Sequence, residues 1–323
     1  MQQSSTVTRY LIFFQYLGTK YSGVMKAPAH QLLQGVQNHL ENAVRRLKPV
    51  NEVSLSISSR TDTGVHALCN SAHLDIQRRG DKPPFTEQVL TDALNFFLKP
   101  EPIRITRVYC VQNDFHARYR AISRTYVYRL ATGVRRHAEL PITEKDLCWT
   151  LWDTELNIDA MREAGAVFQG THDFSTFRAL SSDAPFKNPV KTMELVQVQP
   201  GLSFSQRHFH RDIQFWELTF KSRSFLYKQV RRMVGTLVAV GRGKLSVDHV
   251  QDLLDTRDST AYPQNMAAPP YGLFLINVEY NDSGKDSIFF KISNLDLLQV
   301  QILSFHPLLF LYRSEAVHRG LND

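Results

Sequence analysis

One short segment carries a single carboxylate between two basic groups, residues 60–67 (Arg-Thr-Asp-Thr-Gly-Val-His-Ala). Residues 53–58 before it alternate apolar and polar side chains as a half-buried strand does, so Asp62 is predicted in a turn just past a strand end, where folds display reactive groups. Asp before Thr-Gly can also do no more than cap its own turn. A solvated turn, however, needs neither Arg60 nor the proton-handling side chain of His66.

A second segment, residues 114–128, interleaves basic with aromatic side chains. Such interleaving suits single-stranded RNA, because Arg and His contact phosphates while aromatic faces stack on bases. Arg118 and Arg124 are its candidate phosphate ligands. Tyr126 and Tyr128 lie two residues apart on a predicted strand, so both point to one face and could equally be core aromatics.

A third segment, residues 225–235, begins a predicted helix that stays apolar through residue 240. Arg232 shares a helical face with Lys228, four residues earlier, and this pair is a solvated or a phosphate-facing basic ridge. Arg231 instead falls in an apolar row. Because a guanidinium keeps its proton when buried, Arg231 needs a carboxylate partner or a water-filled cleft.

The elements that must position these segments alternate between strands and helices. Hydrophobic periodicity predicts strands over residues 9–16, 53–58, 70–76, 103–111, 124–131, 191–198, 213–221 and 272–280. It predicts helices over residues 34–48, 86–98, 158–168, 225–240 and 247–254. No strict βαβ repeat appears, which favours an α+β fold with a mixed, mainly antiparallel sheet flanked by helices. We expect two similar lobes, residues 8–112 and 113–282, and an extension of unknown structure over 283–323.

Composition fits a globular protein with a polyanionic partner. The chain has 323 residues, 43% of them apolar, and 38 Lys and Arg against 31 Asp and Glu, a net charge of +7. Its three cysteines lack metal-ligand spacing, which predicts no metal site, no disulfide framework and an intracellular protein. Residues 1–8 show no targeting signal, and no stretch is apolar and long enough to predict a membrane span.

Together the three segments resemble the motifs of the TruA-type tRNA pseudouridine synthases, and the resemblance runs from about Tyr10 to Tyr280. It implies the pseudouridine synthase fold with a central basic cleft. Asp62 matches the catalytic aspartate of the first motif, and Tyr126 matches the first tyrosine of the second motif. Arg231 matches the arginine that the third motif places against that aspartate, so we expect an ion pair between Arg231 and Asp62.

The resemblance also includes residues 170–177 and 272–275, and it has two departures. Bacterial members usually follow the first strand with Gly-Trp-Gln, where this chain has Gly-Val-Met at residues 23–25. Thr63 replaces the usual alanine after the aspartate. These changes bear on the choice of RNA more than on the chemistry.

The implied reaction is the isomerisation of uridine to pseudouridine within RNA, most simply tRNA, an intramolecular transfer of class EC 5.4.99.-. It needs no cofactor and no metal, because nothing is gained or lost overall. Asp62 would act as nucleophile at C1′ or as base at the 2′ position. Arg231 would keep Asp62 ionised, and Tyr126 would stack on the base and relay the proton that leaves C5. The expected RNA-binding residues are Arg60, His66, Arg118, Arg124, Tyr128, Lys228 and Arg232.

Two rival functions remain at this point. An N-glycosidic hydrolase would also attack a sugar carbon, but it normally needs two carboxyl groups, and the nearby motif acids are Asp114 and Asp173. The other rival is a catalytically idle RNA-binding protein. The family implies a homodimer, and resemblance to its vertebrate subgroup implies mitochondria, with cytoplasm or nucleus as alternatives.

Overall fold

The computed structural model describes residues 7–80, 82–136, 139–152, 155–180, 188–203 and 212–281, so the expected extension over 283–323 lies outside the described residues. The helices are α1 (Val36–Arg46), α2 (Glu87–Phe97), α3 (Ile158–Val167), α4 (Gln229–Gly241) and α5 (Val247–Thr256), with short 3-10 turns η1 (Gly18–Lys20), η3 (Ile142–Glu144) and η6 (Pro270–Gly272). The strands are β1 (Val7–Tyr16), β2 (Leu55–Ile57), β3 (His66–Gln77), β4 (Ile103–Val111), β5 (Ala121–Thr132), β6 (Trp149–Thr150), β7 (Gly170–Asp173), β8 (Val190–Pro200), β9 (Gln214–Ser222) and β10 (Leu273–Tyr280).

The described strands form one sheet of ten strands in the order β4-β1-β3-β10-β5-β9-β8-β7, with β2 paired to β3 and β6 to β5. Two pairs are parallel, β10 with β3 and β5 with β6, and the others are antiparallel. The predicted α+β class with a mixed, mainly antiparallel sheet is therefore confirmed. The two-lobe division and the central basic cleft stay predictions.

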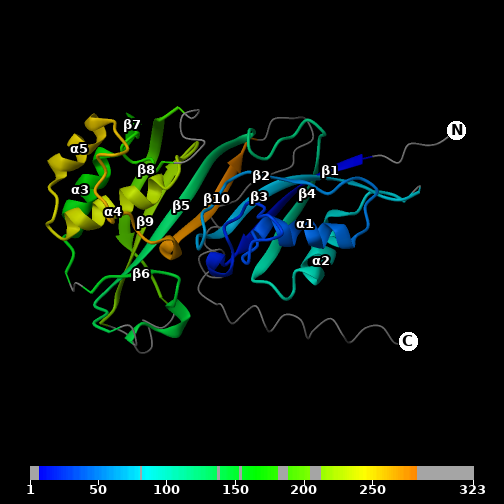
Figure 1. The fold of residues 1–323 in the computed structure, drawn as a ribbon, viewed down its shortest axis with the longest axis horizontal. Helices are drawn as coiled ribbons and strands as arrows, with labels where there is room; N and C mark the ends of the chain where they lie inside the picture. The colour runs from blue at the N-terminus through cyan, green and yellow to red at the C-terminus, as the bar shows by residue number, and fades with distance from the viewer. Residues whose placement is uncertain are drawn as a thin grey trace.

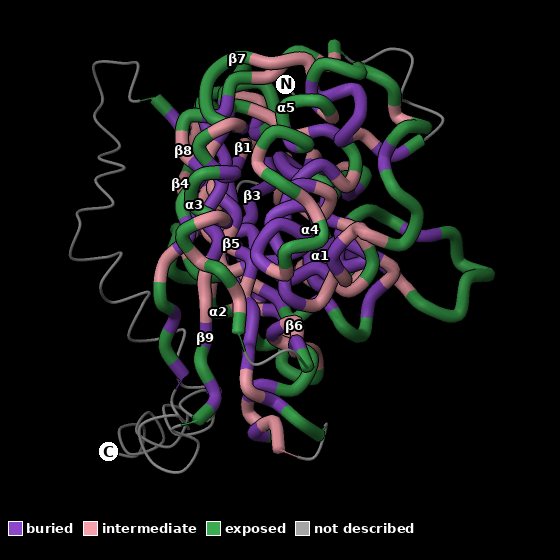
Figure 2. The backbone as a smooth tube through the Cα atoms, turned by 90° about the vertical axis from the view of Figure 1, so that its left-hand side faces the viewer, coloured by how far each residue is buried: buried purple, intermediate pink, exposed green. Residues whose placement is uncertain are grey.

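Helices lie along both ends of this sheet (Figure 1). Helices α1 and α2 lie beside β1, β3 and β4, whereas α3, α4 and α5 gather beside β7, β8 and β9. Helix α1 turns Val36, Leu40 and Val44 inward at helical spacing. Helix α4 is buried almost all round, and buried backbone runs through the middle of the molecule in Figure 2.

The parallel pairing of β3 with β10 determines where the motifs meet. His66 pairs with Phe274, so these two adjacent parallel strands start side by side. The loop that holds Asp62 leads into β3, and η6 leads into β10. On the other side of β10, Leu275 pairs with Tyr126 of β5. Three segments far apart in the chain therefore converge at one place.

The structure differs from the predicted elements at two points. The helix expected from residue 225 begins at Gln229, because Lys228 adopts a left-handed backbone with φ of 57° and caps the helix instead of joining it. The short strands β6 and β7 escape prediction, since two to four residues are too few to display a period.

Candidate active site

The loop that carries Asp62 is fixed by backbone hydrogen bonds on both sides. The Ser58 N–H donates to the carbonyl oxygen of Ser71 at 2.9 Å, and the Val24 N–H donates to that of Thr61 at 3.2 Å. The loop closes as a tight turn in which the Val65 N–H donates to the Asp62 carbonyl oxygen at 3.1 Å.

Glycine is required within this turn, because Gly64 has a φ of +78°, in the left-handed region that other residues adopt at a cost. Buried side chains add two further contacts. The hydroxyls of Tyr16 and Thr61 lie 2.7 Å apart, and the Asn70 amide donates to the Ser59 carbonyl oxygen at 2.9 Å. The Asp62 backbone is therefore held in one position before any substrate arrives.

The predicted partner of Asp62 is present. The Arg231 Nη1 lies 3.5 Å from the Asp62 Oδ2, and the two side chains are 14% and 27% exposed. The same guanidinium donates from Nε to the Ala268 carbonyl oxygen at 2.7 Å, which fixes its direction. The expected ion pair is thus confirmed as a single, partly exposed contact, and the expected setting of Arg231 against a carboxylate is confirmed with it.

Burial and charge act on the Asp62 carboxyl in opposite directions. Burial raises the pKa of Asp62, while the positive charges of Arg231 and Lys228 lower it, and the net result is a raised pKa. The carboxylate is therefore less well stabilised than in water and a stronger base. The two cations therefore oppose part of the effect of burial on this carboxyl.

Tyr126 completes the cluster from β5. Its side chain is 7% exposed and meets the ring of Phe225 edge to face, with ring centroids 5.0 Å apart. Burial raises the pKa of Tyr126, and the charge of nearby Asp62 raises it further. Among the described residues the Tyr126 hydroxyl makes no hydrogen bond, so it is available to a ligand.

His66 does not match its expected role as an RNA ligand. It is completely buried, its ring stacks on Phe274, and its Nδ1 accepts from the Gly18 N–H at 3.0 Å. Its Nε2 lies 3.0 Å from the carbonyl oxygens of both Asp146 and Tyr271. Burial lowers the pKa of His66 to about 4, so the imidazole is neutral. His66 joins the starts of β3 and β10 and has no surface for RNA.

Arg124 is also corrected from RNA ligand to structural residue, because its side chain is buried and bonded on all sides. Its Nη1 donates to the Arg223 carbonyl oxygen at 2.6 Å and its Nη2 to that of Arg118 at 2.9 Å. The guanidinium also reaches the hydroxyls of Ser58 at 3.3 Å and Ser59 at 3.4 Å. Arg124 therefore attaches the Asp62 loop to β5 and to the end of β9.

The other predicted RNA ligands differ in exposure. Tyr128 is fully buried and its hydroxyl donates to the Pro269 carbonyl oxygen at 2.8 Å, so the alternative of a core aromatic is the correct one. Arg60 and Arg118 are exposed, and Arg118 lies over the ring of Tyr119 at 5.9 Å. Both arginines therefore lie at the molecular surface.

Lys228 and Arg232 do not form the helical ridge expected from their spacing. Lys228 precedes the helix, and the partly buried Arg232 donates from Nη1 to the carbonyl oxygens of Thr176, Arg178 and Ser259 at 2.7, 2.8 and 3.3 Å. Three carbonyl acceptors fix an arginine far more firmly than solvent does. Both cations nevertheless line one pocket.

No second acid joins Asp62 within the described part of the chain. Asp114 pairs with Arg120 at 2.7 Å, and Asp173 accepts from the Ser175 N–H at 2.8 Å as a turn cap. The described residues also contain no group of three potential metal ligands. Over the same residues, no helix has the length and apolar character needed to cross a membrane.

Sequence reasoning missed the residues that support the site. Ser58, Ser59 and Asn70 hold the Asp62 loop, and Ala268 orients Arg231. Small residues in a strand end or a loop give no periodic signal. Their role follows only from the segments that the fold brings to them.

Comparison with known proteins identifies the family of the chain. The family model described as tRNA pseudouridine synthase matches residues 12–120 and 164–281, and the chain belongs to this family. The predicted resemblance is therefore confirmed.

Two relatives from animals are more similar to the chain than one relative from a bacterium. The chain is 51% identical to tRNA pseudouridine synthase-like 1 of Xenopus laevis over 278 residues, covering 86% of this chain and 93% of that protein. It is 48% identical to the protein of the same name from Homo sapiens, covering 88% and 93%. Identity to tRNA pseudouridine synthase A of Paramagnetospirillum magneticum is 37%, covering 86% and 98%.

Proposed function

We propose that the protein is a pseudouridine synthase that isomerises uridine in tRNA, with Asp62 as its catalytic residue. The observation that carries this proposal is the fixed Asp62 carboxylate, paired with Arg231 and lying near the unbonded hydroxyl of buried Tyr126. The family membership and the names of its relatives support the same substrate class.

In the proposed reaction the N1–C1′ bond of uridine breaks and a C5–C1′ bond forms. Asp62 begins this exchange either by adding to C1′ or by removing the 2′ proton, and its raised pKa suits both roles. The uracil turns over in the pocket, and the proton that leaves C5 is balanced by one gained at N1. Because burial raises the pKa of Tyr126, its phenol stays protonated and relays this proton by giving one up as it takes one.

RNA reaches this site, in our proposal, through a central basic cleft between two similar lobes, residues 8–112 and 113–282. Arg60 and Arg118 are the exposed cations that contact its backbone. The target uridine must leave its stack, which costs a few kcal/mol and less in a loop than in a duplex, so a tRNA loop is favoured. A homodimer and a mitochondrial location complete the proposal.

The rival functions have weaker support. The described residues place Arg231 and Lys228, and no second carboxylate, close enough to act on Asp62, which disfavours a two-carboxylate hydrolase. An idle RNA-binding protein would not need a carboxylate of raised pKa beside an unbonded phenol.

The test is Asp62→Asn with unmodified tRNA transcripts, where pseudouridine is mapped by chemical labelling and RNA binding is measured in parallel. Turnover should fall at least about 100-fold, since a nucleophile or base contributes roughly 10²–10⁴-fold, while binding stays within several-fold. Measurable activity of Asp62→Asn near that of the wild type would reject the assignment. Free uracil from the wild type would indicate the hydrolase, and binding without product the idle protein.

A further inference from the structure

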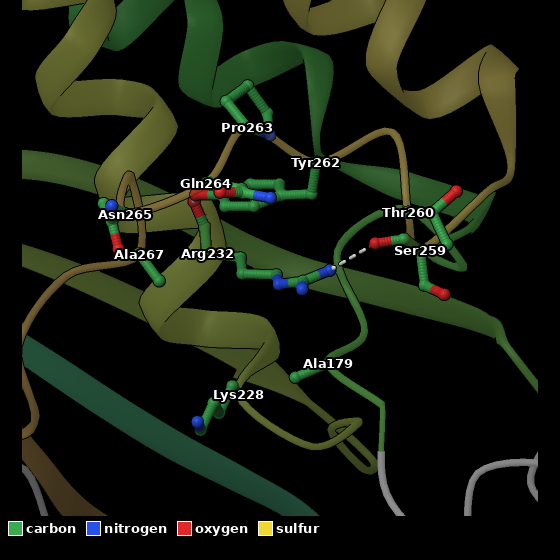
Figure 3. Close-up of a pocket in the computed structure, with 10 residues that line it drawn as sticks. All are labelled: Ala179, Lys228, Arg232, Ser259, Thr260, Tyr262, Pro263, Gln264, Asn265 and Ala267. Carbon is green, nitrogen blue, oxygen red and sulfur yellow. Dashed lines mark hydrogen bonds between the residues drawn. The ribbon is translucent and has the colours of Figure 1, made fainter.

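A pocket of about 350 Å³ lies between the start of α4 and the segment that follows α5 (Figure 3). Its volume falls in the range of roughly 300–1,000 Å³ typical of small-ligand sites. It is lined by Ala179, Lys228, Arg232, Ser259, Thr260, Tyr262, Pro263, Gln264, Asn265 and Ala267.

This pocket adjoins the catalytic cluster. Lys228 lines it and is also close enough to Asp62 to lower the pKa of that carboxyl. Ala267 lines it too, and the next residue, Ala268, holds the Arg231 guanidinium through its carbonyl oxygen at 2.7 Å. A polymer with one residue at Asp62 therefore has its neighbouring residue within reach of the pocket.

The pocket favours an anion, because its lining contains two cations and no carboxylate. Among the described residues the Lys228 ammonium makes no hydrogen bond or ion pair, and it lies 5.2 Å from the centre of the Tyr227 ring. The Nη1 of Arg232 donates to three carbonyl oxygens, whereas its Nε and Nη2 donate to no described residue. Each of the two cations therefore has N–H donors that could bind a ligand.

Two amide side chains also line the pocket (Figure 3). Gln264 and Asn265 are exposed, and their side chains make no hydrogen bond to other described residues. Each amide offers a paired donor and acceptor, which is the complement of a nucleobase edge. Two cations and two amides thus line one pocket.

The walls of the pocket are rigid. Tyr262 donates from its hydroxyl to the Arg232 carbonyl oxygen at 2.7 Å, and the Arg232 guanidinium lies 4.5 Å from the centre of its ring. A Cβ at Gly235 would lie 1.9 Å from the Met266 carbonyl oxygen, so glycine lets this segment lie directly on α4. The segment over residues 262–268 is therefore preorganised, which lowers the entropy cost of binding.

We propose that this pocket binds the nucleotide next to the target uridine, with its phosphate at Lys228 and Arg232 and its base edge at Gln264 and Asn265. The inference rests on the proposed function and extends it, because it makes the pocket a determinant of which sequence around a uridine is accepted. A phosphate contact positions the strand, and a base contact selects it.

The experiment uses unmodified tRNA transcripts whose phosphates are sparsely ethylated, so that each phosphate is neutralised in some molecules. Wild type, Lys228→Gln and Gln264→Ala are compared, with Lys244→Gln, an exposed lysine just beyond the other end of α4, as the matched control. In the wild type, ethylation of one phosphate adjacent to the modified uridine should block binding. Lys228→Gln should bind RNA about five- to ten-fold more weakly and lose that one interference signal.

Gln264→Ala should instead keep the signal and weaken discrimination among bases next to the target, by up to about ten-fold. Lys244→Gln should match the wild type in both respects. The inference fails if wild type modifies the transcripts but Lys228→Gln keeps its interference pattern, or if Gln264→Ala keeps its base preference. Absence of pseudouridine with the wild type would instead reject the proposed function itself.

Discussion

The Asp62 carboxyl has two opposing influences, burial that raises its pKa and two cations that lower it. In the proposed reaction the carboxylate is the reactive form, so we expect activity to fall as the pH drops through the pKa of Asp62. That pKa lies above the ordinary value of about 3.9 for aspartate. Because the pKa of Asp62 is raised, its carboxylate becomes protonated at a pH closer to neutral than an ordinary aspartate does.

We expect the single-turnover rate of the wild type to decline on the acid side with one proton, at a midpoint above pH ~4. Lys228→Gln removes a charge that lowers the pKa of Asp62, so its midpoint should move to higher pH. Lys244→Gln should keep the midpoint of the wild type. Identical profiles for all three proteins would show that the Lys228 charge does not reach Asp62.

At the scale of elements, the site depends on how one loop is attached to two strands. Arg124 on β5 donates to the carbonyl oxygens of Arg223 and Arg118 and to the hydroxyls of Ser58 and Ser59. The planar guanidinium can reach several acceptors at once, which a lysine ammonium does less well. It therefore positions the loop of Asp62 without touching the substrate itself.

Arg124→Lys should accordingly lower kcat at least about ten-fold, because a displacement of about 1 Å at a reacting group can cost up to roughly 100-fold. Its KM should change much less. Arg118→Lys is the contrasting variant, since the exposed Arg118 is proposed to contact RNA and its loss should act mainly on KM. A rise in KM with normal kcat for Arg124→Lys would indicate that Arg124 contacts RNA instead of positioning the Asp62 loop.

Across the molecule, the pair of Arg231 and Asp62 joins two segments that are 169 residues apart in the chain. Asp62 precedes β3, and Arg231 belongs to α4. Ala268 is bonded to Arg231 twice, since its N–H also donates to the Arg231 carbonyl oxygen at 2.9 Å. The contacts that pack α4 against residue 268 therefore also orient the Arg231 side chain toward Asp62.

Arg231→Ala should lower the free energy of unfolding by about 1–3 kcal/mol, the usual cost of removing a charged donor from its acceptors. A fully buried pair would cost about 3–5 kcal/mol, but this pair is partly exposed and meets at one contact of 3.5 Å. Denaturant titration measures the difference, with Lys244→Ala expected to lie within about 0.5 kcal/mol of wild type. An Arg231→Ala protein as stable as wild type would mean that water replaces the arginine at no cost.

The elements with a clear hydrophobic pattern can be predicted from the sequence, which also singles out Asp62 as the candidate reactive group. The strand around residues 103–111 and the amphipathic helix α1 can be predicted because burial on one face imposes a period of 2 or 3.6. The strand around residues 9–16 can be predicted from a continuous apolar run, which is buried on both faces. Asp62 and Arg231 stand out as candidate functional residues, because an isolated acid in a glycine turn and an arginine in an apolar row are both unusual.

The tertiary contacts distinguish the basic and aromatic residues that are buried and bonded within the fold from those that stay exposed. His66, Arg124 and Tyr128 look like RNA ligands in a sequence, yet all three are buried and bonded to backbone carbonyl oxygens. Likewise the pocket beside Lys228 arises where the segment after α5 packs on α4. The physical reason is that a side chain's partners come from strands and loops far away in the chain, whereas sequence spacing records only its own element.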